Sequence, residues 1–468
     1  MVNFETRSAI ALVLSLGLTA SVVAQEATTT AQPSADTQQA ESSATNWDAG
    51  NSSFGNGGVF GAASTDNAGI SQRSAAAAYQ LGGAGVASSG RSVEGNILTS
   101  PTRGRPIRFD NGIFVYPSAS IGYGRNDNVL GTQTNKVSSS FFVVRPELVG
   151  EIKTHGDRYT LSYQGNYGRY QSSSADNFNH HELWLGGDNY FTTRARLGWG
   201  VGYLEKSDPR GSTDRASSTE PDRWHAPIAR VLGIYGAPGS IGRLELEGSM
   251  MQKRYDNNRA TTIASDVDLN TVAGRFYYRF MPKTSVLFEV RNTWADYVWA
   301  NSTQDNTDTR YYAGFVWDAT AKTTGTLKLG RAYKRFDDAS RQDASVASWE
   351  ASVRWAPLTY STVDLLASRA PLDSTGTGNY VLNNATTLTW NHKWASYVSS
   401  RLNYGVIKSD YKGSTREDDT KNYGVGFFHE LGYRMRAGID WTRTDRTSND
   451  QLYNFKRDVT MVTLEAVL

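Results

Sequence analysis

The feature that most constrains this chain is a two-residue alternation of apolar with small or polar residues between Gly112 and Leu468. In ARLGWGVGYLE (residues 195–205), large apolar side chains alternate with glycines. Because successive side chains of a β-strand point to opposite faces, this period indicates strands and not helices. The pattern recurs through about nine hairpin repeats with alternately short and long connections, which is typical of a transmembrane β-barrel. Only a closed barrel lets strands pair every backbone polar group inside lipid.

The alternating segments predict an all-β fold: a transmembrane up-and-down antiparallel β-barrel of about 18 strands, an even number as in bacterial single-chain barrels. The composition of 25 Tyr, 12 Trp, 44 Gly and 12 Pro suits strands and turns. The predicted strands lie near residues 112–124, 139–153, 158–170, 179–192, 194–206, 223–235, 241–254, 267–281, 284–298, 308–320, 324–337, 345–357, 360–370, 380–393, 397–411, 420–432, 434–446 and 454–468.

The connections differ in length on the two sides of each strand. Tight turns such as THGD, APGS, MPKT, PLTY and GYRM follow the even-numbered strands, and longer polar stretches such as SDPRGSTDRASSTEPDR, from Ser207, follow odd-numbered ones. Outer-membrane barrels place short turns in the periplasm and long loops outside, so we expect both termini in the periplasm. Pro117, Pro146 and Pro227 fall inside predicted strands and predict bulges or strand ends there.

Composition divides the chain into three parts. Residues 1–24, with Arg7 before an apolar core at Ala9–Leu18, resemble a secretory signal peptide, with a membrane anchor as the alternative. Residues 25–105 are a low-complexity segment that we expect to be flexible and periplasmic, although its Gly/Ala stretch could instead form a short helix or a plug in the lumen. Residues 106–468 are the predicted barrel.

The two faces of several predicted strands differ in charge. In 241–254, Leu244 and Leu246 fall on one face, and Glu245 and Glu247 on the other. Since a charge that faces lipid at the midplane costs about 2–4 kcal/mol, the charged face must line the interior. The predicted lumen-lining residues are Arg145, Glu147, Glu151, Glu245, Glu247, Arg275, Arg279, Glu289, Arg291, Glu350, Arg354, Asp364, Lys393, Arg401, Arg434, Arg436 and Asp440. These residues could form a salt-bridge lattice that stiffens the wall, line a wet path for a polar solute, or do both.

Aromatic residues near strand ends, on the face opposite these charges, predict the girdles at the two membrane interfaces. The predicted girdle residues are Trp199, Tyr203, Trp317, Trp355, Trp390 and Trp441.

Chemical motifs are weak throughout the chain. Cysteine is absent, and 48 basic against 46 acidic residues argue against a nucleic-acid partner. His180 and His181 are adjacent and so point to opposite faces of a strand, and the RNDN at 125–128 could hold calcium but is more simply the polar opening of a loop. No H-E-x-x-H, G-x-S-x-G or Walker motif occurs. We predict no enzyme, cofactor or metal, with a Ser/His barrel hydrolase as the last alternative.

The segment FDNGIFVYPSASIGYGRNDNVL (109–130) carries a family resemblance. Gly112, Pro117 and the pair Asp127–Asn128 resemble the opening of the outer-membrane β-barrel porin family associated with exopolysaccharide biosynthesis and export gene clusters. The resemblance extends over 101–468 and implies an 18-stranded barrel that helps polysaccharide to cross the outer membrane. It also implies periplasmic polysaccharide-export proteins as partners. The chain departs from common barrel insertion signals because it ends in Leu468 and not in an aromatic residue.

Three functions remain open from the sequence. The first is a porin-like outer-membrane barrel that takes part in exopolysaccharide or capsule export. The second is a general diffusion porin for small polar solutes, and the third is a closed structural or adhesion barrel. In each case we expect the outer membrane of a Gram-negative bacterium as the location. The expected partners are outer-membrane lipid and lipopolysaccharide, together with polysaccharide or another polar solute.

Overall fold

The computed structural model describes residues 107–109, 112–154, 156–215, 218–237, 240–320, 322–374, 376, 378–432 and 434–467. The predicted signal peptide (1–24) and flexible segment (25–105) lie outside the described residues.

The described residues are almost entirely β-strand. The strands are β1 (Ile107–Arg108), β2 (Ile113–Asn126), β3 (Ser139–Thr154), β4 (Asp157–Tyr170), β5 (Phe178–Tyr190), β6 (Ala195–Asp208), β7 (Asp222–Tyr235), β8 (Gly242–Tyr255), β9 (Val267–Met281), β10 (Thr284–Tyr297), β11 (Asn306–Thr320), β12 (Thr323–Phe336), β13 (Ala344–Leu358), β14 (Ser361–Asp373), β15 (Tyr380–Ala395), β16 (Val398–Lys412), β17 (Glu417–Glu430), β18 (Met435–Ser448) and β19 (Phe455–Val467). Short helices are η2 (Ser174–Asp176), α4 (Arg259–Thr262), η3 (Ile263–Ser265) and η4 (Gln451–Tyr453). None of the helices among the described residues is long and apolar enough to cross a membrane.

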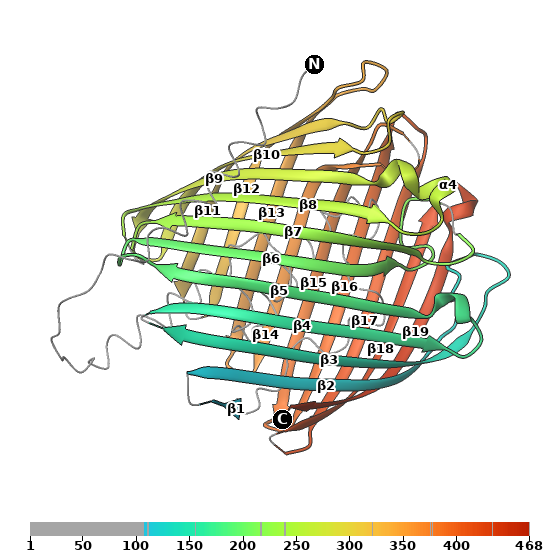
Figure 1. Cartoon of the computed structure of the whole chain (residues 1–468), viewed down its shortest axis with the longest axis horizontal. Helices are drawn as coiled ribbons and strands as arrows, with labels where there is room; N and C mark the ends of the chain where they lie inside the picture. The colour runs from blue at the N-terminus through green and yellow to red at the C-terminus, as the bar shows by residue number, and fades with distance from the viewer. Residues whose placement is uncertain are drawn as a thin grey trace. The chain divides into compact units, whose positions relative to one another are not determined.

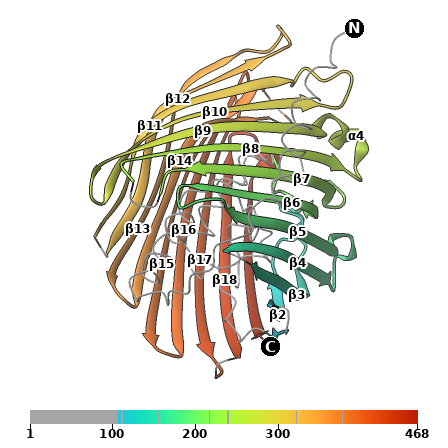
Figure 2. The ribbon, with the colours of Figure 1, turned by 60° about the vertical axis from the view of Figure 1, so that its left-hand side comes forward.

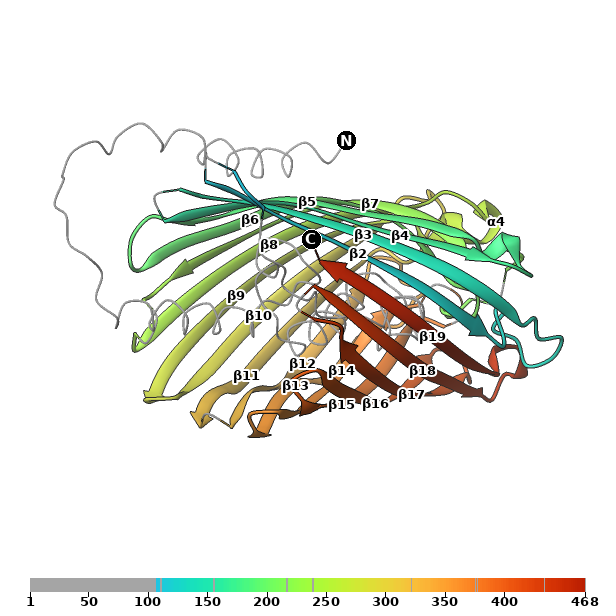
Figure 3. The ribbon, with the colours of Figure 1, turned by 90° about the horizontal axis from the view of Figure 1, so that it is seen from below.

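The strands from β2 to β19 form one closed antiparallel barrel, in which each strand pairs with the next along the chain (Figures 1 and 2). The sheet closes where β19 pairs with β2, from Val459 opposite Asn126 to Val467 opposite Ser118 (Figure 3). The first residues of β2, which β19 does not reach, pair instead with β1, where Ile107 lies opposite Val115. The prediction of an 18-stranded up-and-down barrel is therefore confirmed, with β1 as a two-residue addition that the sequence did not suggest.

Each predicted strand overlaps an observed one, and the ends differ by at most three residues. The largest differences are at β17, which begins at Glu417 and not at 420, and at β14, which ends at Asp373 and not at 370. The prolines interrupt the register as expected: the β3–β4 pairing skips Pro146, and the β7–β8 pairing skips Pro227. Pro117 lies just past the last β19–β2 pair, where no strand bond from its nitrogen is needed.

The two ends of the barrel differ in their connections. Turns such as 282–283 and 359–360 connect strands at the end that also holds Ile113 and Val467, which we call the short-turn end. Longer connections such as 127–138 and 209–221 lie at the other end, which we call the long-loop end and where Figure 1 shows α4. The alternation of short and long connections predicted from the sequence is present.

The inner and outer faces alternate along each strand. On β8, Arg243, Glu245 and Glu247 are buried, whereas Leu244 and Leu246 between them are exposed on the outside. The inner face also holds apolar clusters near the long-loop end. One cluster spans β5 to β10 and consists of Trp184, Leu204, Trp224, Ala226, Met251, Tyr255, Val267, Leu269, Ala295 and Tyr297. The inner face of β5 to β10 at this end thus carries packed side chains, which give the adjoining loops a firm base.

Candidate functional site

Glu289 on β10 is the centre of an ion-pair lattice on the inner face of β8 to β13. Its carboxylate lies 2.5 Å from Arg291 and 3.1 Å from Lys328. Arg275 on β9 approaches the same carboxylate to 3.2 Å. On the far side Glu350 of β13 lies 2.9 Å from Arg291 and also pairs with Lys328. Neighbouring strands thus present opposite charges to one another along this wall.

Arg275 joins the lattice to β8. Its guanidinium is 2.5 Å from Glu247 and 3.6 Å from Glu245, and its side chain is 3% exposed. Tyr277 donates to Glu245 over 3.1 Å and lies beneath the guanidinium of Arg243. Because several buried carboxylates share this one cation, removing it would leave buried negative charge without compensation. This part of the interior is therefore built as a structural lattice.

The other predicted interior residues lie on the same inner face by strand register, at separate places around the barrel, except Arg434, which is exposed in the turn before β18 because the strand begins only at Met435. Arg354 pairs with Asp364 at 2.9 Å, and Arg436 pairs with Glu465 at 3.0 Å. Three of the remaining residues form hydrogen bonds: Arg145 donates to Asn166, Glu147 accepts from Ser118, and Glu151 accepts from Tyr116. Arg401 lies over the ring of Phe428. By cross-strand pairing, Arg279 lies opposite Ser285, Lys393 opposite Ser399 and Asp440 opposite Gly426.

Several inward charged residues were missed from the sequence. Lys328 stands between Leu327 and Leu329, so the alternation alone places it on the inner face. Arg310 and Asp308 on β11 pair with each other at 2.7 Å, again inside. Parity could have found all three, but the partners of Lys328, which are Glu289 and Glu350, lie on other strands, and the sequence does not show which strands meet.

The β6–β7 loop (209–221, described at 209–215 and 218–221) crosses the mouth of the barrel at the long-loop end. Arg416 before β17 donates to the backbone oxygen of Asp214 over 2.7 Å. Counted through the β19–β2 seam, β6 and β16 are eight strands apart in the closed 18-strand wall, so this contact joins nearly opposite sides of the mouth. Asp214 is fully buried, and its carboxylate lies 3.4 Å from the hydroxyl of Ser374 after β14. The sequence predicted a long outside loop here but not that it folds inward.

Arginines of β18 and β19, five to seven strands away from β6 and β7 round the closed wall, hold the loop by its backbone. Arg446 on β18 donates to the oxygens of Gly211 (3.2 Å) and Thr213 (3.0 Å), and Arg457 on β19 donates to that of Arg210 (2.7 Å). Hydrogen bonds from a charged donor contribute about 1.5–3 kcal/mol each. We call Arg416, Arg446 and Arg457 the strap arginines. Together they fix the backbone of residues 210–214, the first half of the loop, against the β16 to β19 side of the barrel.

The β2–β3 loop adds a close backbone approach to the same region. A side chain at Gly131, which has a φ of +62°, would place its Cβ 2.8 Å from the backbone oxygen of Arg210 and 3.1 Å from the Cα of Gly211. Only glycine fits such a contact without displacing the loop.

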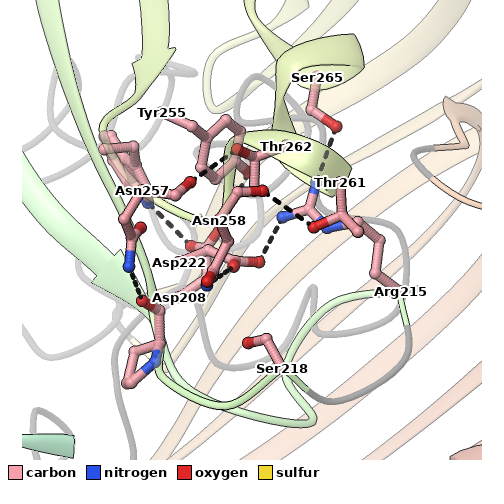
Figure 4. A network of polar contacts seen from close by, with 12 residues as sticks. Asp208, Arg215, Ser218, Asp222, Tyr255, Asn257, Asn258, Thr261, Thr262 and Ser265 are labelled. Carbon is pink, nitrogen blue, oxygen red and sulfur yellow. Dashed lines mark hydrogen bonds and ion pairs between the residues drawn. The ribbon is translucent and has the colours of Figure 1, made fainter. Parts of the chain in front are cut away.

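A network of buried polar groups anchors the loop at its β7 side (Figure 4). Arg215 donates to Asp222 over 2.6 Å and to Ser265 of η3 over 2.7 Å. Asp222 also accepts from Asn258 over 2.7 Å. Burial alone would lower the pKa of the Arg215 guanidinium, but Tyr255 and the Asp222 carboxylate raise it above its usual value. This anchor therefore keeps its positive charge throughout the physiological pH range.

Asp208 at the end of β6 completes the network at the start of the loop. Its carboxylate accepts from the indole of Trp224 over 2.9 Å and from the hydroxyl of Tyr255 over 3.0 Å. Lys253 lies 3.4 Å from the same carboxylate and 4.4 Å from the centre of the Trp224 ring. Both ends of the crossing loop are thus tied to β6–β8.

The predicted girdle residues all lie on the outer face. Trp199, Trp317, Trp355 and Trp390 lie nearer the short-turn end of their strands, and Tyr203 and Trp441 come just before the first charged outward residues, Glu205 and Arg443. The outer face between the two sets carries exposed apolar residues such as Leu246 (58%), Phe288 (53%) and Ile439 (48%). This arrangement is that of a lipid-facing band bounded by aromatic residues.

The histidines and the RNDN segment take structural contacts. His180 faces inward, 2.8 Å from the hydroxyl of Ser207, whereas His181 faces outward, 3.0 Å from that of Tyr163. The Asp127 carboxylate accepts from the amide of Asp458. Within the described residues no group of three or more His, Cys, Asp or Glu side chains is arranged to hold a metal ion.

Comparisons with solved structures find distant similarity to outer-membrane proteins. The chain is 12% identical to the outer membrane protein OpdK from Pseudomonas aeruginosa, over 76% of this chain and 98% of that one, with a TM-score of 0.44. A BenF-like porin from Pseudomonas fluorescens Pf-5 is 10% identical over 76% of this chain and 99% of that one, with a TM-score of 0.45. A bacterial polysaccharide outer membrane secretin is 11% identical over 75% of this chain and 98% of that one, with a TM-score of 0.35. No curated protein matches the sequence.

A family model settles the relationship. The model described as "Putative beta-barrel porin 2" matches residues 111–467, which is the whole closed barrel from the start of β2 to the end of β19. Such a barrel, with a lipid-facing apolar band, is the architecture of porin-like proteins of the Gram-negative outer membrane. The chain therefore belongs to the "Putative beta-barrel porin 2" family.

Proposed function

We propose that this protein is a non-enzymatic outer-membrane channel through which exopolysaccharide leaves the cell. The observation that carries the proposal is a set of neutral hydrogen-bonding side chains on the inner face of β15 to β18. Asn391, Asn403, Asn422 and Thr444 point inward by register and are partly exposed. Thr444 donates to the side-chain oxygen of Asn422 over 2.9 Å, so the hydroxyl and the amide lie side by side on this face.

Amides and hydroxyls suit the passage of sugars. They exchange hydrogen bonds with sugar hydroxyls at little net cost, and a passing solute must be bound weakly enough to leave. The charged lattice of β8 to β13 is self-paired and so offers few strong sites that would trap a polymer. The resemblance of residues 109–130 to proteins of exopolysaccharide gene clusters supports the same cargo. Periplasmic polysaccharide-export proteins are then the proposed partners at the short-turn end.

A general diffusion porin is the second candidate, and the crossing loop favours it. A loop fixed across the mouth narrows the opening, which suits small solutes better than a polymer.

Deleting the gene distinguishes polymer export from general diffusion of small solutes. If the protein exports polymer, the deletion strain lacks secreted exopolysaccharide and takes up small sugars and amino acids at the normal rate. Normal polymer outside the cell together with slower small-solute uptake would instead establish the diffusion porin.

We also propose that the short-turn end and both termini face the periplasm. Short turns on that side are the rule in outer-membrane barrels. Because the chain has no cysteine, single cysteines report the orientation cleanly. In intact cells a membrane-impermeant maleimide should label Leu452→Cys in the β18–β19 loop, where the side chain is 75% exposed. Ile241→Cys at the short-turn end (65% exposed) should be labelled only after lysis. The reverse pattern would invert the proposed orientation.

A further inference from the structure

The outer face of β12, β14 and β16 carries a row of cations. Arg331 lies opposite Ala347 on β13, and two residues further along that strand Trp349 lies opposite Arg369 on β14. Arg369 lies opposite Asn384 on β15, and Asn384 lies opposite Lys408 on β16. Neighbouring strands are about 4.8 Å apart, so cations on alternate strands are about 10 Å apart along the wall. We call Arg331, Trp349 and Arg369, with Lys408 beside them, the arginine row.

In the part of the chain that the structure describes, few protein acceptors contact the guanidinium groups of Arg331 and Arg369. The Nε of Arg331 donates to Ser345 over 3.1 Å, and the Nε of Arg369 is buried without a hydrogen-bond partner. Within the described residues no carboxylate forms an ion pair with either arginine. Elsewhere on the outer face such pairs are present: Arg254 lies 2.5 Å from Asp268, and Arg443 lies 3.6 Å from Asp458.

The surrounding outer face is also free of competing negative charge at this level. From β11 to β15 the described outward strand residues around the row are either neutral, such as Thr309, Tyr311 and Asn384, or basic, as is Arg335. Asp373 at the end of β14 turns to Lys334 on the inside, at 2.7 Å. Lys408, at the edge of the row, has Asp419 as its cross-strand neighbour, so the two arginines are the principal charges.

The depth of the row in the membrane makes these charges costly without an anion. On β14 only Val363, Leu365 and Ala367 face lipid before Arg369, whereas a membrane-spanning strand needs about 9–11 residues. Arg369 therefore lies at the edge of the hydrocarbon layer, where the indole of a tryptophan such as Trp349 is favoured. An arginine at this depth is stabilised by a phosphate, which its planar guanidinium binds through two hydrogen bonds.

We propose that the arginine row is a binding site for a phosphorylated glycolipid of the outer leaflet. The two arginines bind the phosphate groups, and Trp349 packs beside the junction of headgroup and acyl chain. The lipid is favoured over a free phosphate because the row faces the bilayer and continues its apolar band. The assignment to the outer leaflet rests on the proposed orientation, whereas recognition of the lipid does not.

The test uses the full-length protein in detergent with bisphosphorylated lipid A as the probe, and native mass spectrometry to count bound lipid. Arg331→Gln/Arg369→Gln, which removes both phosphate-binding side chains, should bind lipid A at least tenfold more weakly, a loss of about 1.4 kcal/mol or more in binding free energy. The matched control is Arg169→Gln/Arg254→Gln, with the same change in charge. These two outward guanidiniums are already occupied by Asn179 and Asp268, and the control should bind lipid A normally.

The comparison of lipids makes the outcome decisive. Lipid A without phosphates should bind equally weakly to the wild type and to Arg331→Gln/Arg369→Gln. Equal binding of lipid A by all three proteins would overturn the site. Equal loss for the row variant and the control would show an unspecific effect of net charge and would also overturn it. If phosphatidylglycerol competes as well as lipid A, the row is not specific for the glycolipid. Heat-dependent gel migration of each variant verifies that the barrel has formed.

Discussion

Replacing residues 210–220 with a short glycine-serine linker should raise the single-channel conductance several-fold. The loop runs from β6–β7 to the strap arginines on the opposite wall, so it occupies the mouth through which ions must pass. Without it the opening is set by the wall alone, and an 18-stranded wall is wide enough for an aqueous channel. Conductance of the purified protein in planar bilayers measures the change directly.

Two further variants keep this expectation testable. Shortening the β12–β13 loop at 338–342, whose Arg341 contacts neighbouring rim loops and not the far wall, should leave conductance unchanged. Arg446→Gln/Arg457→Gln releases the loop without removing it and should give noisier, larger currents. A conductance that stays at the wild-type value in both the loop deletion and the released variant would show that the constriction lies elsewhere in the barrel.

Placing an arginine on the lipid-facing band should abolish insertion. Leu246→Arg, Val353→Arg and Ile439→Arg each put a charge toward hydrocarbon, which costs about 2–4 kcal/mol near the midplane. Leu246 is 58% exposed and Ile439 is 48% exposed on the outer face, so neither charge can turn inward. Refolding into vesicles, followed by gel migration without boiling, measures the inserted fraction. Leu246→Ala is the matched control and should insert normally.

The effect of replacing an inward arginine with alanine should depend on how many buried carboxylates that arginine contacts. Arg354→Ala, which removes the 2.9 Å pair with Asp364, should insert and change ion selectivity. Arg275→Ala should lower the free energy of unfolding by about 3–5 kcal/mol, because Glu245, Glu247 and Glu289 lose a shared buried cation. If Leu246→Arg inserted while Arg354→Ala failed to, every face would be shifted by one residue.

The barrel itself could be predicted from the sequence because its physics is local. Alternation gives the faces, and the need to keep charge out of lipid tells which face is inside, as for Glu245 beside Leu246. The same alternation could have placed Arg446 inside, because it shares its strand face with the predicted interior residue Asp440. The crossing loop could not be predicted, because polar residues such as those of 209–221 suit water and buried hydrogen bonds equally well. Its position depends on Arg416, Arg446 and Arg457, which are more than 190 residues away along the chain.

The closing pair β19–β2 has a consequence for how the molecule is made. Every other strand pairing of the wall joins neighbours along the chain, whereas this one places Val459 opposite Asn126. Bringing such distant segments together carries the largest loss of chain entropy and makes closure the slow step of folding. Until it happens β2 and β19 are open edges, ready to pair with any other extended chain. The barrel is thus most vulnerable to aggregation in the interval between the synthesis of its last strand and the formation of that seam.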